Sequence, residues 1–339
     1  MPTDSNLQTV IITGGTGYVG QHIVAQLLHQ NYSVIIIDVS PTRAMEIVRL
    51  FNHPNLQYKI VDQLNQPHSI DFVLKEFPHA SIFIASAAVV PRDNIVDFDR
   101  EIIQMNHDIL KYSLDSIKQC GTNIKQVILT SSTAAYVGPD KAFAIDVAYS
   151  DNDWNPLPYD AGRGSVSAAY FVSKKFNEQM AWQFMKDEQP NFDLVTLAPS
   201  FCIGPAYFNS QISIDNLPSS TSVVGDLLKL SRHDTVPSFG AGAVDVRDVA
   251  KSHISVINNP KANGQRLVVE AYKFTNANTV NILKDHFPQL KDKLPDVEPI
   301  PESKFVGPNL KRSKEVLAIN RYYTLAESVV DLAKQLLKE

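Results

Sequence analysis

Short apolar runs, rich in β-branched residues, recur through the first two hundred residues of the chain. Most of them are near-continuous rather than alternating, which is typical of parallel strands covered on both faces. The runs lie at residues 10–12, 34–37, 58–61, 81–84, 127–129 and 194–197. Between the first two, Val19, Ile23 and Leu27 recur every four residues, as on one face of a helix. Strands that alternate with helices predict an α/β fold with a doubly wound parallel sheet.

The strand pattern lapses at two turn-rich segments, residues 138–167 and 205–222. Segments of that length inside a compact domain are more often functional loops than filler. One late strand is expected at residues 266–269. At the C-terminus, Thr324 and Glu327 suit a capping box that opens a final amphipathic helix.

The composition is that of an ordinary globular protein. The chain has 339 residues, of which 44% are apolar and 20% charged, with a net charge of -5. There is no block of lysine and arginine and no apolar run of membrane-spanning length, so neither a nucleic acid nor a membrane is an expected partner. The polar N-terminus carries Asp4 and does not fit a secretory signal, so we expect a cytoplasmic protein. Two cysteines, Cys120 and Cys202, and scattered histidines predict no disulfide framework and no metal site.

A glycine-rich loop follows the first predicted strand and opens the first predicted helix. In VIITGGTGYVGQHI, Gly14, Gly17 and Gly20 are spaced by three residues. Glycines permit a tight turn and a close approach of the backbone to a pyrophosphate, and the helix N-terminus favours its negative charge. The loop therefore predicts a dinucleotide site, although a tight turn alone is the alternative. The loop residues are Gly14, Gly15, Thr16, Gly17, Tyr18, Val19 and Gly20.

Asp38, at the end of the second predicted strand, lies eighteen residues beyond Gly20. A carboxylate at about this spacing hydrogen-bonds the ribose hydroxyls of NAD and repels the 2′-phosphate of NADP. Asp38 thus favours NAD(H). Arg43, five residues later, could hold that phosphate instead, so NADP(H) stays possible; a solvated loop arginine is the plainer interpretation.

The ends of the next two predicted strands carry weaker signals. Asp62 could reach the adenine amino group, or could be an ordinary residue of a strand-end turn. Ala85, Ser86 and Ala87 are small and could leave room for a cofactor, or could simply pack closely.

The segment AYFVSKK places Tyr170 and Lys174 four residues apart, on one face of a helix. A neighbouring cation favours the phenolate, which brings the tyrosine pKa closer to the range useful in acid–base catalysis. Ser132 follows the fifth strand, where ligands of open parallel sheets bind, so its hydroxyl and that of Tyr170 could share one carbonyl oxygen. The alternative is that Tyr170 packs and Lys174 is solvated.

In this order along the chain, the motifs TGGTGYVG, LTSSTAA, AYFVSKKFNEQMAW, LAPSFCIGP, DVRDVAKSH and NGQRLVVEAYKFT resemble those of an extended short-chain dehydrogenase/reductase. Within that superfamily, the chain resembles the yeast-type methylglyoxal/ketone reductases and plant dihydroflavonol reductases. The resemblance implies a Rossmann-like NAD(P)-binding domain made of residues 1–204 and 243–272. Residues 205–242 and 273–339 would form a smaller substrate-binding lobe.

The resemblance also implies residue roles. Ser132 matches the residue that polarises the substrate carbonyl, and Tyr170 matches the general acid. Lys174 matches the residue that binds the nicotinamide ribose and lowers the tyrosine pKa. Asn106 matches a supporting asparagine that can hold a structural water, although an ordinary polar helix residue would look the same.

Further cofactor contacts follow from the same resemblance. Pro199 and Cys202 match the loop that covers the nicotinamide, and Cys202 is expected to pack there and not to act as a nucleophile. Asp62, Gln63 and Ser220 match additional contacts. The yeast reductases have an arginine where Val39 stands, which supports the NAD(H) preference, and a histidine where Ala85 stands.

These features predict an NAD(P)H-dependent oxidoreductase that reduces aldehyde or ketone carbonyls, with Tyr170 as proton donor and Ser132 as stabiliser of the oxygen. Apolar residues would suit a small carbonyl substrate. The expected substrate contacts are Ser132 and the pocket walls Val90, Tyr136, Ser167 and Phe201, and each of these four walls could instead be a core residue.

Two other functions share these motifs. An NAD-dependent sugar-nucleotide epimerase or dehydratase would need a diphosphate clamp, for which Arg232, Arg247 and Arg266 are sparse candidates. A non-catalytic NAD-binding regulator would not need all of Ser132, Tyr170 and Lys174. Monomer and homodimer are both compatible with the sequence, and dimers are common in the superfamily.

Overall fold

The computed structural model describes residues 7–91, 94–217 and 220–338, so the polar segment around Asp4 lies outside the described residues. Its centre is a seven-stranded sheet in the order β3-β2-β1-β4-β5-β6-β9, in which every neighbouring pair is parallel. The strands are β1 (Thr9–Thr13), β2 (Ser33–Asp38), β3 (Leu56–Ile60), β4 (Ala80–Ala85), β5 (Gln126–Thr130), β6 (Asp193–Pro199) and β9 (Arg266–Val269). All seven predicted strands are present, and the predicted Rossmann-like doubly wound α/β fold is confirmed.

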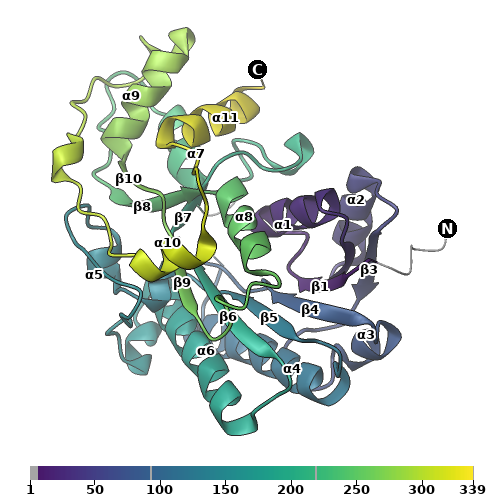
Figure 1. The fold of residues 1–339 in the computed structure, drawn as a ribbon. Helices are drawn as coiled ribbons and strands as arrows, with labels where there is room; N and C mark the ends of the chain where they lie inside the picture. The colour runs from purple at the N-terminus through teal and green to yellow at the C-terminus, as the bar shows by residue number, and fades with distance from the viewer. Residues whose placement is uncertain (1–6, 92–93, 218–219, 339) are drawn as a thin grey trace.

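Helices cover both faces of this sheet (Figure 1). One face carries α1 (Tyr18–His29), α2 (Pro41–Phe51) and α8 (Val246–Val256), with α10 (Lys311–Leu317) at its margin. The other carries α3 (Asp71–Glu76), α4 (Met105–Cys120) and α6 (Val166–Glu188). Within β1, Val10 and Ile12 join the first layer and Ile11 joins the second, so an unbroken apolar strand serves two cores.

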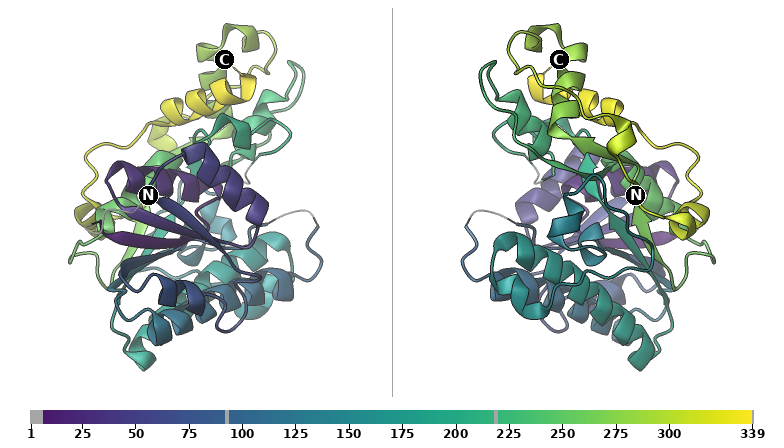
Figure 2. Two further views of the ribbon diagram at one scale, coloured as in Figure 1. Left: turned by 90° about the vertical axis from the view of Figure 1, so that its right-hand side faces the viewer. Right: turned by 90° about the vertical axis from the view of Figure 1, so that its left-hand side faces the viewer.

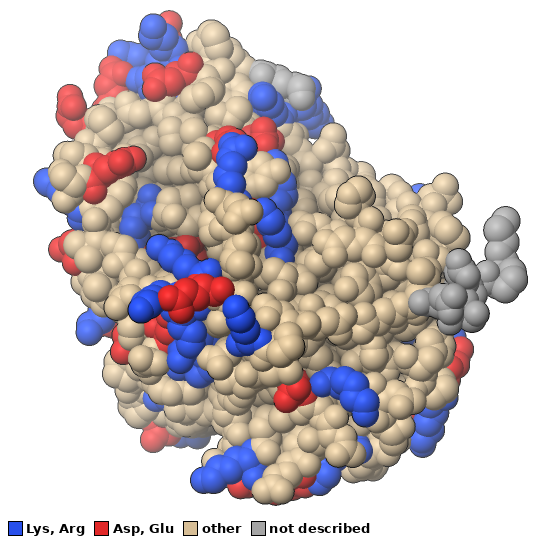
Figure 3. All heavy atoms as spheres, viewed as in Figure 1, with Lys and Arg blue, Asp and Glu red and all other residues tan. Residues whose placement is uncertain are grey.

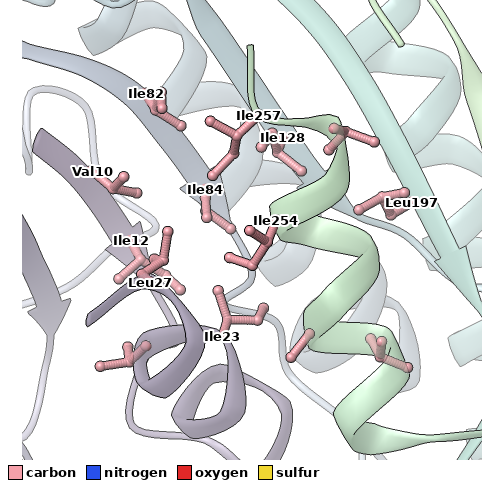
Figure 4. Close-up of a cluster of buried hydrophobic side chains, with 14 of the residues drawn as sticks. Val10, Ile12, Ile23, Leu27, Ile82, Ile84, Ile128, Leu197, Ile254 and Ile257 are labelled. Carbon is pink, nitrogen blue, oxygen red and sulfur yellow. The ribbon is translucent and has the colours of Figure 1, made fainter. Parts of the chain in front are cut away.

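The packing between α1 and α8 places the glycine loop over the sheet. Figure 4 shows Ile23 and Leu27 of α1 and Ile254 of α8 in one cluster with Ile84 and Ile128 of the sheet. Burying an isoleucine or leucine side chain stabilises the fold by about 1.5–3 kcal/mol. This cluster therefore fixes the N-terminus of α1 relative to the strand ends.

A second lobe lies beyond the carboxyl ends of β6 and β9 (Figure 2). Its three strands, β7 (Phe201–Ile203), β8 (Gly240–Asp245) and β10 (Tyr272–Thr275), were not predicted. The helices α7 (Ser222–Leu228), α9 (Asn276–His286) and α11 (Leu325–Leu337) pack around them. The capping box of Thr324 and Glu327 is present at α11. The domain division at residues 204, 242 and 272 stays a prediction, and β8 runs across the middle boundary.

The remaining segments contain little regular structure. Before α6 begins at Val166, the segment from residue 138 holds α5 (Pro139–Ala142) and the 3₁₀ turn Tyr159–Arg163. A π-helical stretch, Asp99–Gln104, leads into α4. Short 3₁₀ turns also occur at Thr133–Ala135, Asn209–Gln211, Pro288–Leu290 and Glu302–Lys304. Among the helices of the described residues, none combines the length and apolar character needed to span a bilayer. On the face shown in Figure 3, basic and acidic side chains are interspersed.

Candidate active site

The candidate site lies at the carboxyl edge of the sheet, next to the point where the chain order reverses between β1 and β4. The glycine loop follows β1, Ala85 ends β4, and Ser132 follows β5. Ligands of open α/β sheets bind at this position because loops from both directions leave a crevice there.

The glycine loop fits a pyrophosphate. Gly14 has φ +75, and a Cβ on it would lie 2.7 Å from the backbone nitrogen of Ala87. A Cβ on Gly20 would lie 2.0 Å from the carbonyl oxygen of Gly14. Only glycine therefore lets the first turn of α1 pack this closely against the loop. Gly17 caps α1 without a side-chain bond, and the first turn of α1, all of it described, has no acidic residue. The N–H groups and dipole at this end therefore favour an anion.

The other loop residues hold the loop against its neighbours. The Tyr18 hydroxyl donates to the carbonyl of Gly204 (2.6 Å), beyond β7. Val19 packs against the core beneath α1. The hydroxyl of Thr16 donates to the carboxylate of Asp38.

Asp38 is occupied by donors of its own chain. Arg43 binds it with Nη2 at 2.7 Å and Nε at 3.2 Å, and the backbone N–H of Ser40 donates at 2.8 Å. Burial alone would raise the pKa of Asp38, but the bonds from Arg43, Thr16 and Ser40 outweigh it and lower that pKa. Arg43 remains 52% exposed, so its guanidinium neutralises Asp38 while facing solvent.

The other predicted cofactor residues lie at neighbouring strand ends. Asp62 and Gln63 are exposed after β3 and line a surface pocket with Phe72. Ala85 is buried at the end of β4. Pro199 ends β6, Cys202 is buried in β7, and Ser220 precedes α7. Their contacts with a cofactor stay predictions.

Helix α6 carries Tyr170 and Lys174 on one face. The helix begins after Ser165, whose hydroxyl accepts the N–H of Ala168 (3.1 Å). Lys174 Nζ lies 5.7 Å from the centre of the Tyr170 ring and donates to the carbonyl oxygen of Thr130 (3.4 Å). The helix thus brings its tyrosine and lysine to the end of β5, as the four-residue spacing predicts.

The pKa of Tyr170 is raised and not lowered, contrary to the sequence-based expectation. Burial raises it, and a hydrogen bond with Ser132 offsets this only in part. Lys174 is itself desolvated, and burial lowers its pKa to about 8 against the opposing charge of Glu178. Tyr170 is therefore in its protonated, proton-donating form at neutral pH, with a lysine close to its own titration range.

Ser132 and Asn106 are held by short contacts. Ser132 caps the turn Thr133–Ala135, and its hydroxyl accepts the N–H of Ala134 (3.2 Å). Asn106 is buried and binds both the N–H (2.6 Å) and the carbonyl (3.0 Å) of Val89, and donates to the hydroxyl of Ser173 (3.1 Å). Asn106 thus ties the segment after β4 to α6, and its role as a water-binding residue stays a prediction.

The predicted pocket walls differ in their surroundings. Val90 is exposed beyond β4, and Ser167 is exposed in the first turn of α6. Phe201 contacts the rings of Phe143 and Phe239. Tyr136 is only 1% exposed. Its ring is covered by Arg266, with Cζ 4.0 Å from the ring centre, which makes it a core residue and not an open wall.

Sequence reasoning missed several residues near the site. Phe143 contacts Phe171, the neighbour of Tyr170, but it lies in the irregular segment 138–167, where no periodic pattern marks it. Phe239 precedes β8, which consists mostly of glycine and alanine and so lacks the sequence pattern of a strand. Glu178 was detectable, because it stands one helical turn beyond Lys174 in the same motif.

Comparison with known proteins identifies the family. The model of the NAD dependent epimerase/dehydratase family matches residues 10–270. The NADPH-dependent methylglyoxal reductase of Saccharomyces cerevisiae is 30% identical, over 97% of this chain and 98% of that protein.

Solved structures give the same picture. Gre2 from Candida albicans in complex with NADPH is 35% identical, with a TM-score of 0.91 over 98% of this chain and 99% of that one. UDP-glucose 4-epimerase from Bifidobacterium longum, in complex with NAD+ and UDP, shares the fold, with 17% identity and a TM-score of 0.69 over 96% of each chain. The reductases are thus much more similar, which confirms the prediction of an oxidoreductase over the epimerase alternative.

The predicted preference for NAD(H) is wrong. The similar yeast reductase is NADPH-dependent, and the similar Candida protein was solved with NADPH. The physical reason is that the Asp38 carboxylate was interpreted as free, whereas Arg43, Thr16 and Ser40 saturate it. A carboxylate already paired with an exposed guanidinium does not repel a phosphate as a free one would.

The glycine loop, the strand-end serine and the tyrosine–lysine pair therefore agree with the comparisons: the chain belongs to the NAD dependent epimerase/dehydratase family, within the extended short-chain dehydrogenase/reductases.

Proposed function

We propose that the protein is an NADPH-dependent reductase of small aldehydes or ketones. The observation that carries the proposal is the convergence of Ser132, Tyr170 and Lys174 at the end of β5, beside the glycine loop. The similarity to a methylglyoxal reductase over nearly the whole chain supports the same reaction class.

The chain's own groups suit NADPH. The N–H groups at the start of α1 would bind the pyrophosphate, and the exposed guanidinium of Arg43 would bind the 2′-phosphate. Lys174 would bind the nicotinamide ribose. When bound, the dinucleotide supplies the hydride for the substrate carbon.

Tyr170 would protonate the carbonyl oxygen. Because burial keeps its pKa above the usual value, its hydroxyl retains a proton to donate at neutral pH. The Ser132 hydroxyl would donate a hydrogen bond to the same oxygen and stabilise the developing negative charge. The Lys174 ammonium, beside the Tyr170 ring, would favour the phenolate left after the proton has moved.

The surroundings favour an apolar substrate. Phe143, Phe201 and Phe239 form mutual ring contacts, and Phe143 also reaches Phe171 beside Tyr170. Phe143 is itself partly exposed. Aromatic walls with few polar groups suit small hydrophobic carbonyl compounds better than a charged sugar nucleotide.

The test is NADPH oxidation by the purified protein with a panel of aldehydes, ketones and diketones. Loss of general acid catalysis lowers rates by about 10²–10⁴-fold, so Tyr170→Phe should lower kcat by that amount. Ser132→Ala should lower kcat by about 10²-fold. A Tyr170→Phe protein with near-normal turnover would refute the assignment, and isomerised sugar nucleotide without net NADPH consumption would indicate an epimerase.

A further inference from the structure

Glu178, one turn beyond Lys174 on α6, is a fully buried carboxylate at 0% exposure. It links α6 to three neighbouring strands of the sheet. The linked positions are Ser131 just after β5, Thr196 within β6 and Arg266 at the start of β9. Its donors are the hydroxyls of Ser131 (2.5 Å) and Thr196 (3.0 Å), Nε1 of Trp182 (3.4 Å) and Nε of Arg266 (2.6 Å). Trp182, Thr196 and Arg266 bind Oε1, and Ser131 binds Oε2, so both oxygens of this buried carboxylate are held in place.

The first consequence concerns Ser132. Its neighbour Ser131 is fixed on both sides, because its N–H donates to the carbonyl of Leu197 (2.7 Å) and its hydroxyl donates to Glu178. Ser132 is extended, with φ -162 and ψ 155. Successive side chains of an extended chain point to opposite sides, so fixing Ser131 on Glu178 turns Ser132 away from Glu178 and toward Tyr170.

The second consequence concerns Lys174. Lys174 and Glu178 line one cavity together with Asn106 and Thr130. Both side chains thus border one space inside the fold, where the attraction between their opposite charges is stronger than in water, and Glu178 is at the same time paired with Arg266 (2.6 Å). Burial lowers the pKa of Lys174 to about 8, and the charge of Glu178 is the largest influence that raises it.

The other titratable groups around Lys174 are uncharged near neutral pH. Tyr170 on α6 has a raised pKa, through burial. Burial also raises the pKa of Cys202 on β7 to about 12. Nε2 of His253, on α8, hydrogen-bonds the hydroxyl of Thr130 (2.8 Å). Burial lowers the pKa of His253 to about 4. Among the described residues, Glu178 is thus the carboxylate that acts on Lys174.

We propose that Glu178 is a positioning residue of the active site: through Ser131 it sets the direction of Ser132, and through its buried charge it holds the Lys174 ammonium beside Tyr170. This inference rests on the proposed reductase function. It adds a residue that touches neither the substrate nor the cofactor and acts only through its neighbours.

Glu178→Gln tests the charge, because it keeps the shape: its amide oxygen can accept from Arg266 and Thr196, and its amide N–H can donate to the hydroxyl oxygen of Ser131. We expect the alkaline limb of the kcat–pH profile to move down by ~1 pH unit, since Lys174 loses its counter-charge. The same fall in the Lys174 pKa should appear without cofactor or turnover, as faster acetylation of Lys174 at neutral pH, followed by mass spectrometry. Glu178→Asp keeps the charge and should restore the wild-type limb.

Two further variants separate positioning from general destabilisation. Thr196→Val removes another buried hydrogen bond to Glu178 but leaves the charge and Ser131 in place, so it should lower stability and leave the alkaline limb unmoved. Ser131→Ala removes the link to Ser132 but keeps the Glu178–Arg266 pair, so kcat should fall about tenfold with an unmoved limb and little change in KM for NADPH. Ser131→Ala also keeps the proposal testable if Glu178→Gln does not fold.

A folded Glu178→Gln protein whose Lys174 acetylation profile and kcat–pH profile both match the wild type would overturn the inference. So would a Ser131→Ala protein with wild-type kcat. If the wild-type protein reduces no carbonyl compound, the reductase proposal fails instead, and the acetylation profile still decides whether Glu178 controls Lys174.

Discussion

The hydroxyl of Thr16, in the glycine loop, donates a hydrogen bond to the carboxylate of Asp38, at the end of β2. In the proposed cofactor site, one buried carboxylate therefore joins the loop expected at the pyrophosphate to the strand end expected at the ribose. The same carboxylate holds Arg43, which means that any 2′-phosphate has to share the guanidinium with Asp38.

We predict that Asp38→Asn strengthens NADPH binding about three- to tenfold, because the amide can still accept from Thr16 but releases Arg43 and removes a negative charge.

Arg43→Ala should raise KM for NADPH about tenfold or more with little effect on kcat, since the lost contact is to a non-reacting phosphate. Titration of both variants with NADPH and NADH measures this. Equal changes for the two dinucleotides would show that neither residue recognises the 2′-phosphate.

Gly20→Ala should disrupt the dinucleotide loop. The new Cβ would lie 2.0 Å from the carbonyl oxygen of Gly14, which cannot move without opening the loop. We expect a loss of stability of about 1–3 kcal/mol, the usual range for overpacking, and loss of the NADPH-induced rise in Tm. Gly307→Ala is the matched control, because nothing lies within 4 Å of its added Cβ, and it should leave both values unchanged. A Gly20→Ala protein that binds NADPH normally would contradict the account of the loop.

The sequence was sufficient to predict the central sheet because its strands carry a strong local signal. Residues 34–37 are four consecutive β-branched or aliphatic residues, and they form the middle of β2. The three strands of the second lobe lack that signal. β8 is Gly-Ala-Gly-Ala-Val-Asp, and its small residues pack because Gly242 leaves space for the carboxylate of Glu270. Such a strand is defined by its partners and not by its own propensity.

The same distinction between local sequence signals and tertiary contacts explains which features of the site could be predicted. Tyr170 and Lys174 were predictable, since their proximity follows from helical spacing alone. The state of Asp38 was not, because it depends on whether the side chain of Arg43 folds back across five residues. The direction of the Tyr170 pKa was also missed, since burial depends on elements remote in sequence, such as β7.

Asp248, in the first turn of α8, offers a test of buried charge. Burial raises its pKa from the usual 3.8 to about 6, and the hydrogen bond from the backbone N–H of Tyr323 (2.7 Å) opposes the rise only in part. Because the folded-state pKa lies above the usual value, folding favours the protonated acid. The ionised carboxylate therefore destabilises the fold above about pH 6, and the penalty disappears as the pH falls toward 4.

Asp248→Asn should thus stabilise the protein at pH 7–8 by about 1–3 kcal/mol, because the amide oxygen can still accept from Tyr323 and carries no charge. At about pH 4 the variant and the wild type should unfold at nearly the same denaturant concentration. Urea unfolding at both pH values measures the difference. Asp245→Asn is the control: Asp245 is equally buried but paired with Arg247 at 2.8 Å, so the same substitution should destabilise the protein at neutral pH. If Asp248→Asn lowered stability at pH 8, the carboxylate would have to be a favourable partner of nearby groups, and burial would not be what governs its ionisation.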